Sequence, residues 1–203
     1  MTELHLESIA AERVDVGDGI SIAAGWDAVV MGEASIPGAV RIAVRYDRDL
    51  RRVVAASVRV DRSDEGDEVT ALTLRAVRVQ AVVAASAMRL VTVARDGADA
   101  KSLDDYRADI HAAEERTTAE AITEAVVLYR IAFTVSLPPL RFVADELEVS
   151  VSTATRMMAK ARQQGLATDL ITRETYNRMQ EEQNRMSAPH QLGGASTGPV
   201  IGR

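Results

Sequence analysis

The side chains best placed for chemistry lie between residues 150 and 167. This segment contains three cations, Arg156, Lys160 and Arg162, and no acidic residue. Guanidinium and ammonium groups bind phosphate oxygens, and a guanidinium can also bind both acceptors on the major-groove edge of a guanine. These residue types at this spacing predict contacts with a nucleic acid rather than a catalysed reaction.

The residues that must position these cations, LRFVADELEVSVSTATRMMA at 140–159, predict a helix-turn-helix. Ser150 is expected to cap the second helix, at about 151–164. Glu148 lies at the turn, where glycine is usual because the backbone prefers a positive φ angle, so some strain is expected there. Small or apolar side chains stand at the positions where such a pair of helices turns inward. They are Val143, Ala144, Leu147, Val149, Ala154 and Met157, with Met158 or Ala161 continuing the buried side.

The outward side of this second helix gives the candidate contacts with double-stranded DNA. Arg156 is the best candidate for reading a guanine directly, and Val151 could meet a thymine methyl group. Hydroxyl groups near the start of the helix could bond base edges or phosphate, whereas the remaining cations suit phosphate contacts. An ordinary solvated helix face is the alternative for each cation. The full set of candidates is Arg141, Ser150, Val151, Ser152, Thr155, Arg156, Lys160 and Arg162.

The charge of the whole chain limits the kind of partner. The net charge of −6 argues against a general nucleic-acid coat protein. Residues 1–117 hold 15 Lys and Arg against 21 Asp and Glu, whereas residues 118–186 hold 8 against 9. A basic face inside an acidic chain predicts a DNA binder whose affinity depends on placement and falls with added salt.

Other chemistry has little support in the 203 residues. The absence of cysteine excludes disulfides, thiolate zinc sites and a cysteine nucleophile. His5, His111 and His190 lie in three separate regions, so no metal site is expected. Gly17 and Gly19 lack the third glycine of a phosphate-binding loop. We therefore expect no enzyme, with no catalytic residue, metal or cofactor.

Hydropathy predicts a cytoplasmic protein without a membrane contact. No run approaches the roughly 18 apolar residues of a membrane span. The N-terminal residues, MTELHLESIAAERVD, are acidic and lack the basic and apolar regions of a secretory signal.

Local patterns predict an α+β fold, with a small β-rich N-terminal domain that also carries helices, followed by an all-α helix-turn-helix domain. Residues 12–60 look β-rich, because polar and apolar residues alternate around the Gly17-Asp18-Gly19 turn and again in 39–46 and 51–61. Residues 47–50 are short enough for a hairpin loop. Thr70 is expected to cap the first of two short helices, in which Leu72, Ala76, Val79 and Val83 recur at helical spacing.

Residues typical of helix ends predict where the helices in the second half of the chain begin and end. Ser102 can open a helix in a largely solvated connector, and Thr117 with Glu120 forms a capping box for a strong helix at 118–135. Pro138 and Pro139 end that helix and begin the next. A further helix at about 173–186 would either pack on the bundle or form a self-association seam. The predicted segments are a β-rich α+β domain at 1–93, an acidic, partly helical connector at 94–117, the helix-turn-helix domain with its trailing helix at 118–186, and a disordered tail at 187–203.

Residues 117–166 resemble the C-terminal helix-turn-helix of many actinobacterial and actinophage proteins. The matching residues are Val143-Ala144, Leu147, Val149-Ser150, Ser152-Thr153-Ala154, Arg156, Ala161-Arg162 and Gly165-Leu166. Some members also have a strand hairpin followed by a stretch similar to Val69-Thr70 and Leu74-Arg75-Ala76-Val77. Glu148 stands where the family usually has Gly, and Met157-Met158 where it often has an aromatic or basic pair. The resemblance covers about half the chain and implies a DNA-binding regulator without a defined ligand or catalytic residue.

Two functions from different classes remain open. The first is sequence-specific binding of double-stranded DNA by a transcriptional regulator. Because one helix-turn-helix contacts few base pairs, this function predicts a homodimer with half-sites about one helical turn apart. The N-terminal domain would hold the pair together or bind a protein partner. The alternative is a structural or adaptor protein, for example a phage assembly factor, whose helical domain makes protein contacts; the acidic front half and Glu148 favour it.

Overall fold

The computed structural model describes residues 2–95, 97–113, 116–170 and 178. The described residues up to Thr168 belong to one compact unit, in which all the strands and helices named below lie. The predicted helix at 173–186, Arg178 apart, and the predicted tail at 187–203 lie outside the described residues. The division at residues 93 and 117 stays a prediction.

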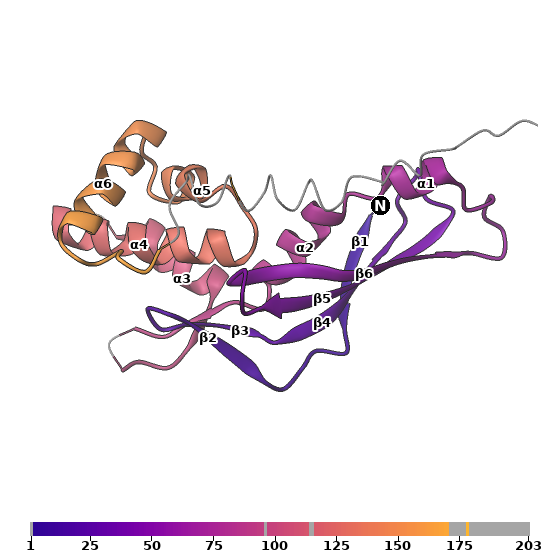
Figure 1. Ribbon diagram of the computed structural model, residues 1–203, viewed down its shortest axis with the longest axis horizontal. Coiled ribbons are helices and arrows are strands. Elements are labelled where there is room, and N and C mark those ends of the chain that lie inside the picture. Colours follow the sequence, from indigo (N-terminus) through magenta and orange to yellow (C-terminus); the bar gives the residue numbers. More distant parts are fainter. Residues whose placement is uncertain (1, 96, 114–115, 171–177, 179–203) are drawn as a thin grey trace, which may run out of the picture. The chain divides into compact units, whose positions relative to one another are not determined.

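Eight strands in the described part of the chain form two antiparallel sheets of four (Figure 1). The first sheet has the order β1 (Glu3–Glu7), β4 (Gly25–Met31), β5 (Gly38–Asp47) and β6 (Arg52–Arg62). The second has the order β2 (Arg13–Gly17), β3 (Ile20–Ala23), β7 (Thr92–Val93) and β8 (Lys101–Ser102). The predicted α+β class and β-rich N-terminal part are therefore confirmed.

Strand β5 is explained by the alternation of buried apolar residues with more exposed ones. Val40, Ile42 and Val44 of β5 face the core and are at most 1% exposed, while their neighbours in the strand are less buried. The predicted hairpin joins β5 to β6, and Val40 lies opposite Val60. β1 was not predicted; it pairs antiparallel with β4, with Leu4 opposite Val30. Leu4 and Val30 are 26 residues apart in the sequence, so no local turn signal predicts the pairing.

Two helices follow the first sheet, as predicted. Thr70 caps α1 (Ala71–Ala76), and α2 (Val79–Met88) packs against β4, β5 and β6. Ser86 of α2 accepts a 3.0 Å hydrogen bond from Nε1 of the buried Trp26. The predicted apolar stripe is wrong at Leu72, which is 72% exposed. The chain forms two separate helices here, because α1 ends at Ala76 and α2 begins at Val79. Helical spacing counted from Leu72 to Val83 therefore does not place Leu72 on the buried side of α2.

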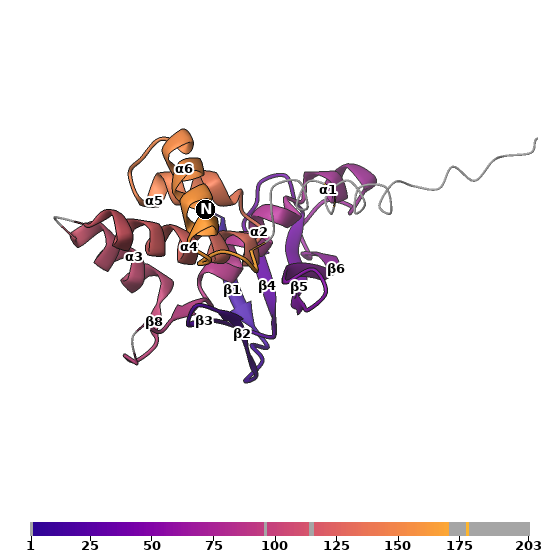
Figure 2. The same cartoon turned by 60° about the vertical axis from the view of Figure 1, so that its left-hand side comes forward.

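The helix α3 (Leu103–Ala112) begins where Ser102 accepts a hydrogen bond from the Asp105 backbone N–H. The expectation of a largely solvated connector is wrong for one face of α3, because Leu103, Tyr106 and Ile110 are buried. β8 pairs with β7, and this pairing places the first turn of α3 against the second sheet. α3 also contacts the helical region that follows (Figure 2).

Three helices complete the unit: α4 (Thr118–Thr134), α5 (Pro139–Glu146) and α6 (Val151–Gln163). The predicted capping box of Thr117 and Glu120 starts α4, and the apolar side chains of Ile122, Val126, Tyr129 and Phe133 are buried. Leu128 and Ile131 are fully buried as well. α4 is apolar on more than one side because it contacts α5, α6 and strand β6. Within the described residues, no helix combines the length and apolarity needed to cross a membrane.

Candidate nucleic-acid interface

The turn between α5 and α6 has the predicted backbone geometry. Glu148 has a φ angle of 53°, in the left-handed region that glycine adopts most easily. The backbone N–H of Val149 donates to the Ala144 carbonyl at 2.9 Å, which closes the end of α5. The expectation of a positive φ at this turn is therefore confirmed, and the residue that adopts it is a glutamate.

Small and apolar side chains hold α5 and α6 together. Val143 and Ala154 are fully buried, and Ala144, another of the predicted inward residues, is 3% exposed. Met158 is fully buried and Met157 only half-buried, so the expectation that Met157 is the main inward residue is wrong. Each helical residue advances about 100°, so Met158 lies closer than Met157 to the direction of Ala154.

The first turn of α6 is built on hydroxyl groups. The Ser150 Oγ accepts a hydrogen bond from the Thr153 backbone N–H at 3.1 Å, so the predicted cap is confirmed. The same oxygen lies 2.8 Å from the Ser152 Oγ. Ser150 is thus engaged in capping, and its role in any contact with DNA is to fix the start of α6 and aim the free backbone N–H groups there.

Four candidates share the outward side of this first part of α6. Val151 is 49% exposed, and Ser152, Thr155 and Arg156 are also exposed. The Thr155 hydroxyl donates to the Val151 carbonyl at 2.8 Å, which leaves its oxygen able to accept. An Arg156 Nη donates to the Thr153 Oγ1 at 3.2 Å. A guanidinium has five N–H groups, so this bond leaves donors for a further partner.

The later cations differ in their surroundings. Lys160 is exposed and follows Arg156 by four residues, which places it on nearly the same side of α6. Arg162 is half-buried, and its Nε is closed off from solvent without a hydrogen-bond partner among the described residues. The structure therefore groups Lys160 with Arg156 and sets Arg162 on the flank.

Two outward residues were missed. Ala159 and Gln163 are exposed and follow Arg156 by three and seven residues, so they continue the same side of the helix. That spacing was available from the sequence, but an alanine and a glutamine carry no charge to draw attention. The Gln163 amide adds a group that can bond to a base edge or a phosphate.

Acidic residues border this surface on the α5 side. The Arg141 Nε lies 3.7 Å from Asp145 Oδ2, in a pair whose side chains are 78% and 68% exposed. Glu148 is exposed in the turn. Negative charge here is favourable at the N-terminal end of α6 but opposes the approach of a phosphate. Arg141 therefore sits beside an acid, unlike Arg156.

α3 supports α5 from another side. The Arg107 Nε donates to the Glu146 Oε2 at 2.8 Å, and Glu146 is 5% exposed. The His111 Nε2 lies 3.1 Å from the Glu146 carbonyl oxygen. The hydrogen bond with Glu146 raises the pKa of Arg107, so the guanidinium stays charged. The position of α5 depends on a helix outside the predicted motif.

Searches against protein families, curated proteins and solved structures found no match to this chain. In the described residues, no group of three or more His, Asp or Glu side chains is arranged to hold a metal ion.

Proposed function

We propose that this protein binds double-stranded DNA in a sequence-specific manner and acts as a transcriptional regulator. In this proposal α5 and α6 form a helix-turn-helix within an all-α C-terminal domain, and α6 enters the major groove. The resemblance to actinobacterial and actinophage helix-turn-helix proteins supports the same function.

The observation that carries the proposal is the outward side of α6. Ser152, Thr155 and Arg156 lie next to one another, are exposed, and have Lys160 one turn further on. α6 contains no acidic residue, and its main contacts with the other described helices and strands are with α4 and α5. Hydroxyl and guanidinium groups on an open helix face can bond both base edges and phosphates.

Specific binding at useful affinity favours two copies of the motif. One α6 would contact only a few base pairs, so we infer a homodimer whose half-sites lie about one helical turn, roughly 34 Å, apart. The β-rich region is the part of the chain that we assign to joining the two copies or to binding a protein partner.

The test is duplex binding by the intact protein, with fragments enriched from genomic DNA and two salt concentrations. Arg156→Ala should weaken specific binding by roughly 1 to 3 kcal/mol if Arg156 reads a base. Lys160→Ala should weaken binding to all sequences about equally and reduce the salt dependence, because a phosphate contact carries no sequence information. Arg48→Ala, in the β5–β6 turn, is the matched control and should leave binding unchanged.

The second candidate function is an adaptor that uses this surface for protein contacts. Glu148, Asp145 and the half-exposed apolar Val151 favour it, because acids repel phosphate and an exposed valine suits a protein interface. The absence of salt-dependent binding to any enriched fragment would support the adaptor and contradict the DNA-binding proposal.

A further inference from the structure

A cavity of about 470 Å³ lies away from α6, between β7, β8, α3 and the first turns of α4. Its size is within the range of small-molecule sites. A second cavity of about 270 Å³ shares Arg95 and Thr123 with it. All the residues that line both cavities belong to the same compact unit.

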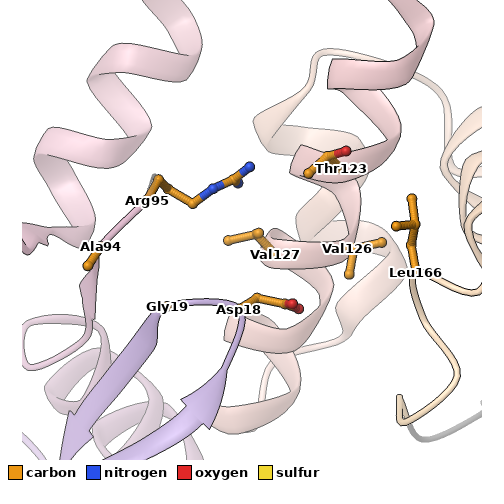
Figure 3. Close-up of a pocket in the computed structure, with 8 residues that line it drawn as sticks. All are labelled: Asp18, Gly19, Ala94, Arg95, Thr123, Val126, Val127 and Leu166. Atoms are coloured by element: carbon orange, nitrogen blue, oxygen red, sulfur yellow. The ribbon is translucent and has the colours of Figure 1, made fainter. Parts of the chain in front are cut away.

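Arg95 is the central charged group of this region. Its side chain extends from the end of β7 towards α4, with the guanidinium near Thr123 (Figure 3). No carboxylate of the described residues forms an ion pair with Arg95, in contrast to Lys101, whose Nζ lies 2.7 Å from Asp109 Oδ2. Arg95 can therefore accept an anionic group from outside the chain.

The Tyr106 hydroxyl is the second unusual group. Tyr106 lines the larger cavity and is 8% exposed, yet its Oη has no hydrogen-bond partner of good geometry among the described residues. Burial raises the pKa of Tyr106, while the charge of Arg95 and a poorly aligned hydrogen bond from its guanidinium oppose that rise. A buried hydroxyl that is satisfied so poorly is rare in folded proteins and needs an explanation.

The charges around the cavity restrict the ligand. Four carboxylates line it, from Asp99, Asp109, Glu120 and Glu124, against the two cations Arg95 and Lys101. A simple anion is therefore disfavoured, although Arg95 and Tyr106 both suit a carboxylate. Glu124 lies 3.0 Å from Arg116, and its burial raises the pKa of its carboxyl group. A cationic group on a ligand would stabilise the charged form of Glu124.

We propose that this cavity binds a small zwitterion of the α-amino-acid type. The ligand carboxylate bonds to Arg95 and, after a small rotation of that side chain, to the Tyr106 hydroxyl. The ligand ammonium faces Glu124. Val93 and Ile110, each 2% exposed, form an apolar wall for an aliphatic side chain. This site does not depend on the proposed DNA binding, and it is tested without DNA.

Helix α3 connects the cavity to α5. Tyr106 and Ile110 of α3 line the cavity, while Arg107 of the same helix holds the buried Glu146 of α5. A ligand that shifts α3 therefore acts on the helix that precedes α6. Ligand binding in the cavity could therefore regulate the function that α6 performs.

The test is calorimetric titration of the intact protein with the twenty standard α-amino acids at up to millimolar concentration. For each aliphatic one, the matching amine without a carboxylate and the matching acid without an amino group are titrated in parallel. We expect at least one aliphatic amino acid to bind, and both matched analogues to bind about tenfold more weakly or not at all.

Variants locate the binding. Arg95→Gln and Glu124→Gln should each weaken binding about tenfold or more, and Tyr106→Phe should weaken it several-fold with an unchanged melting temperature. Arg48→Gln is the matched control and should bind like the original protein. Absence of binding by every amino acid would overturn the proposal. So would equal binding of the carboxylate analogue, or binding that survives both Arg95→Gln and Glu124→Gln.

Discussion

Three residues at helix ends adopt a left-handed backbone conformation, and two of them are not the glycine that is most favourable there. Ser136, Glu148 and Gly165 follow α4, α5 and α6 with φ angles of 63°, 53° and 75°. In each case the next residue donates its backbone N–H to a carbonyl near the end of the helix, at 2.8 to 2.9 Å. The same helix-ending geometry is thus made by a serine, a glutamate and a glycine, and only the glycine adopts it without strain.

Glu148→Gly should stabilise the protein. Glycine removes the cost of the left-handed conformation but adds backbone freedom to the unfolded chain, so we expect the free energy of unfolding to rise by up to about 1 kcal/mol. Urea unfolding measures the change. Gly165→Ala is the matched control, because an added Cβ there would meet nothing within 4 Å; it should lower stability by about 1 kcal/mol. A loss of stability in Glu148→Gly would show that the glutamate side chain contributes more than its backbone costs.

Among the helices, α4 begins with a capping box whose contribution to stability depends on pH. Glu120 Oε2 accepts a 2.8 Å hydrogen bond from the Thr117 backbone N–H and another from the Thr117 hydroxyl. These bonds lower the pKa of the Glu120 carboxyl below its ordinary value. The contribution of the Glu120 carboxyl to the cap is therefore largest while Glu120 is ionised.

The sign of the effect follows from the lowered pKa. The stabilisation by Glu120 is complete above the pKa of glutamate in the unfolded chain, and it is lost as the pH falls through the lower pKa of the folded state. We expect the difference in unfolding free energy between the original protein and Glu120→Gln to shrink as the pH falls through that range. Urea unfolding across a series of pH values measures it. A difference that stays constant with pH would contradict a role for the ionised carboxyl.

At the scale of the whole unit, α4 is tied to both sheets by residues far apart in sequence. The Arg130 Nε donates to the Asp18 Oδ2 at 2.8 Å, in the turn between β2 and β3. The Ser136 hydroxyl donates to the Val53 carbonyl at 3.0 Å. Gly17 permits the first contact, because a Cβ there would stand 2.9 Å from the Arg130 guanidinium. These contacts make the β-rich part and α4 support one another.

Asp18→Ala should weaken this connection. The Arg130 side chain is 11% exposed, so loss of its carboxylate partner leaves a mostly buried charge with fewer bonds. We expect the free energy of unfolding to fall by roughly 1 to 3 kcal/mol, with a single transition observed by far-ultraviolet circular dichroism and by Trp26 fluorescence. Arg48→Ala, which breaks an exposed pair with Glu12, should change stability by less than about 1 kcal/mol. Two separate transitions, only one of them shifted, would show that α4 unfolds independently of the sheets.

Features that depend on a few neighbouring residues could be predicted from the amino-acid sequence. The caps at Thr70, Ser102, Thr117 and Ser150 form as predicted, because a capping side chain and its N–H partner lie within three residues. Alternation in 39–46 predicted β5 and its buried face for the same reason. The outward placement of Arg156 also followed from local spacing, whereas its contact with DNA stays a prediction.

Only the tertiary structure decided the features that depend on distant partners. β1 alternates polar and apolar residues over only five positions, and its place in the sheet is set by pairing with the distant β4. β7 and β8 are two residues each and pair across the loop between them. The cavity beside Arg95 and Tyr106 forms only when β7, α3 and α4 converge. The Arg130–Asp18 pair joins residues 112 positions apart. Such contacts form between segments that are far apart in the sequence. The pattern of neighbouring residues does not specify which distant segment will be the partner, so these contacts could not be predicted from it.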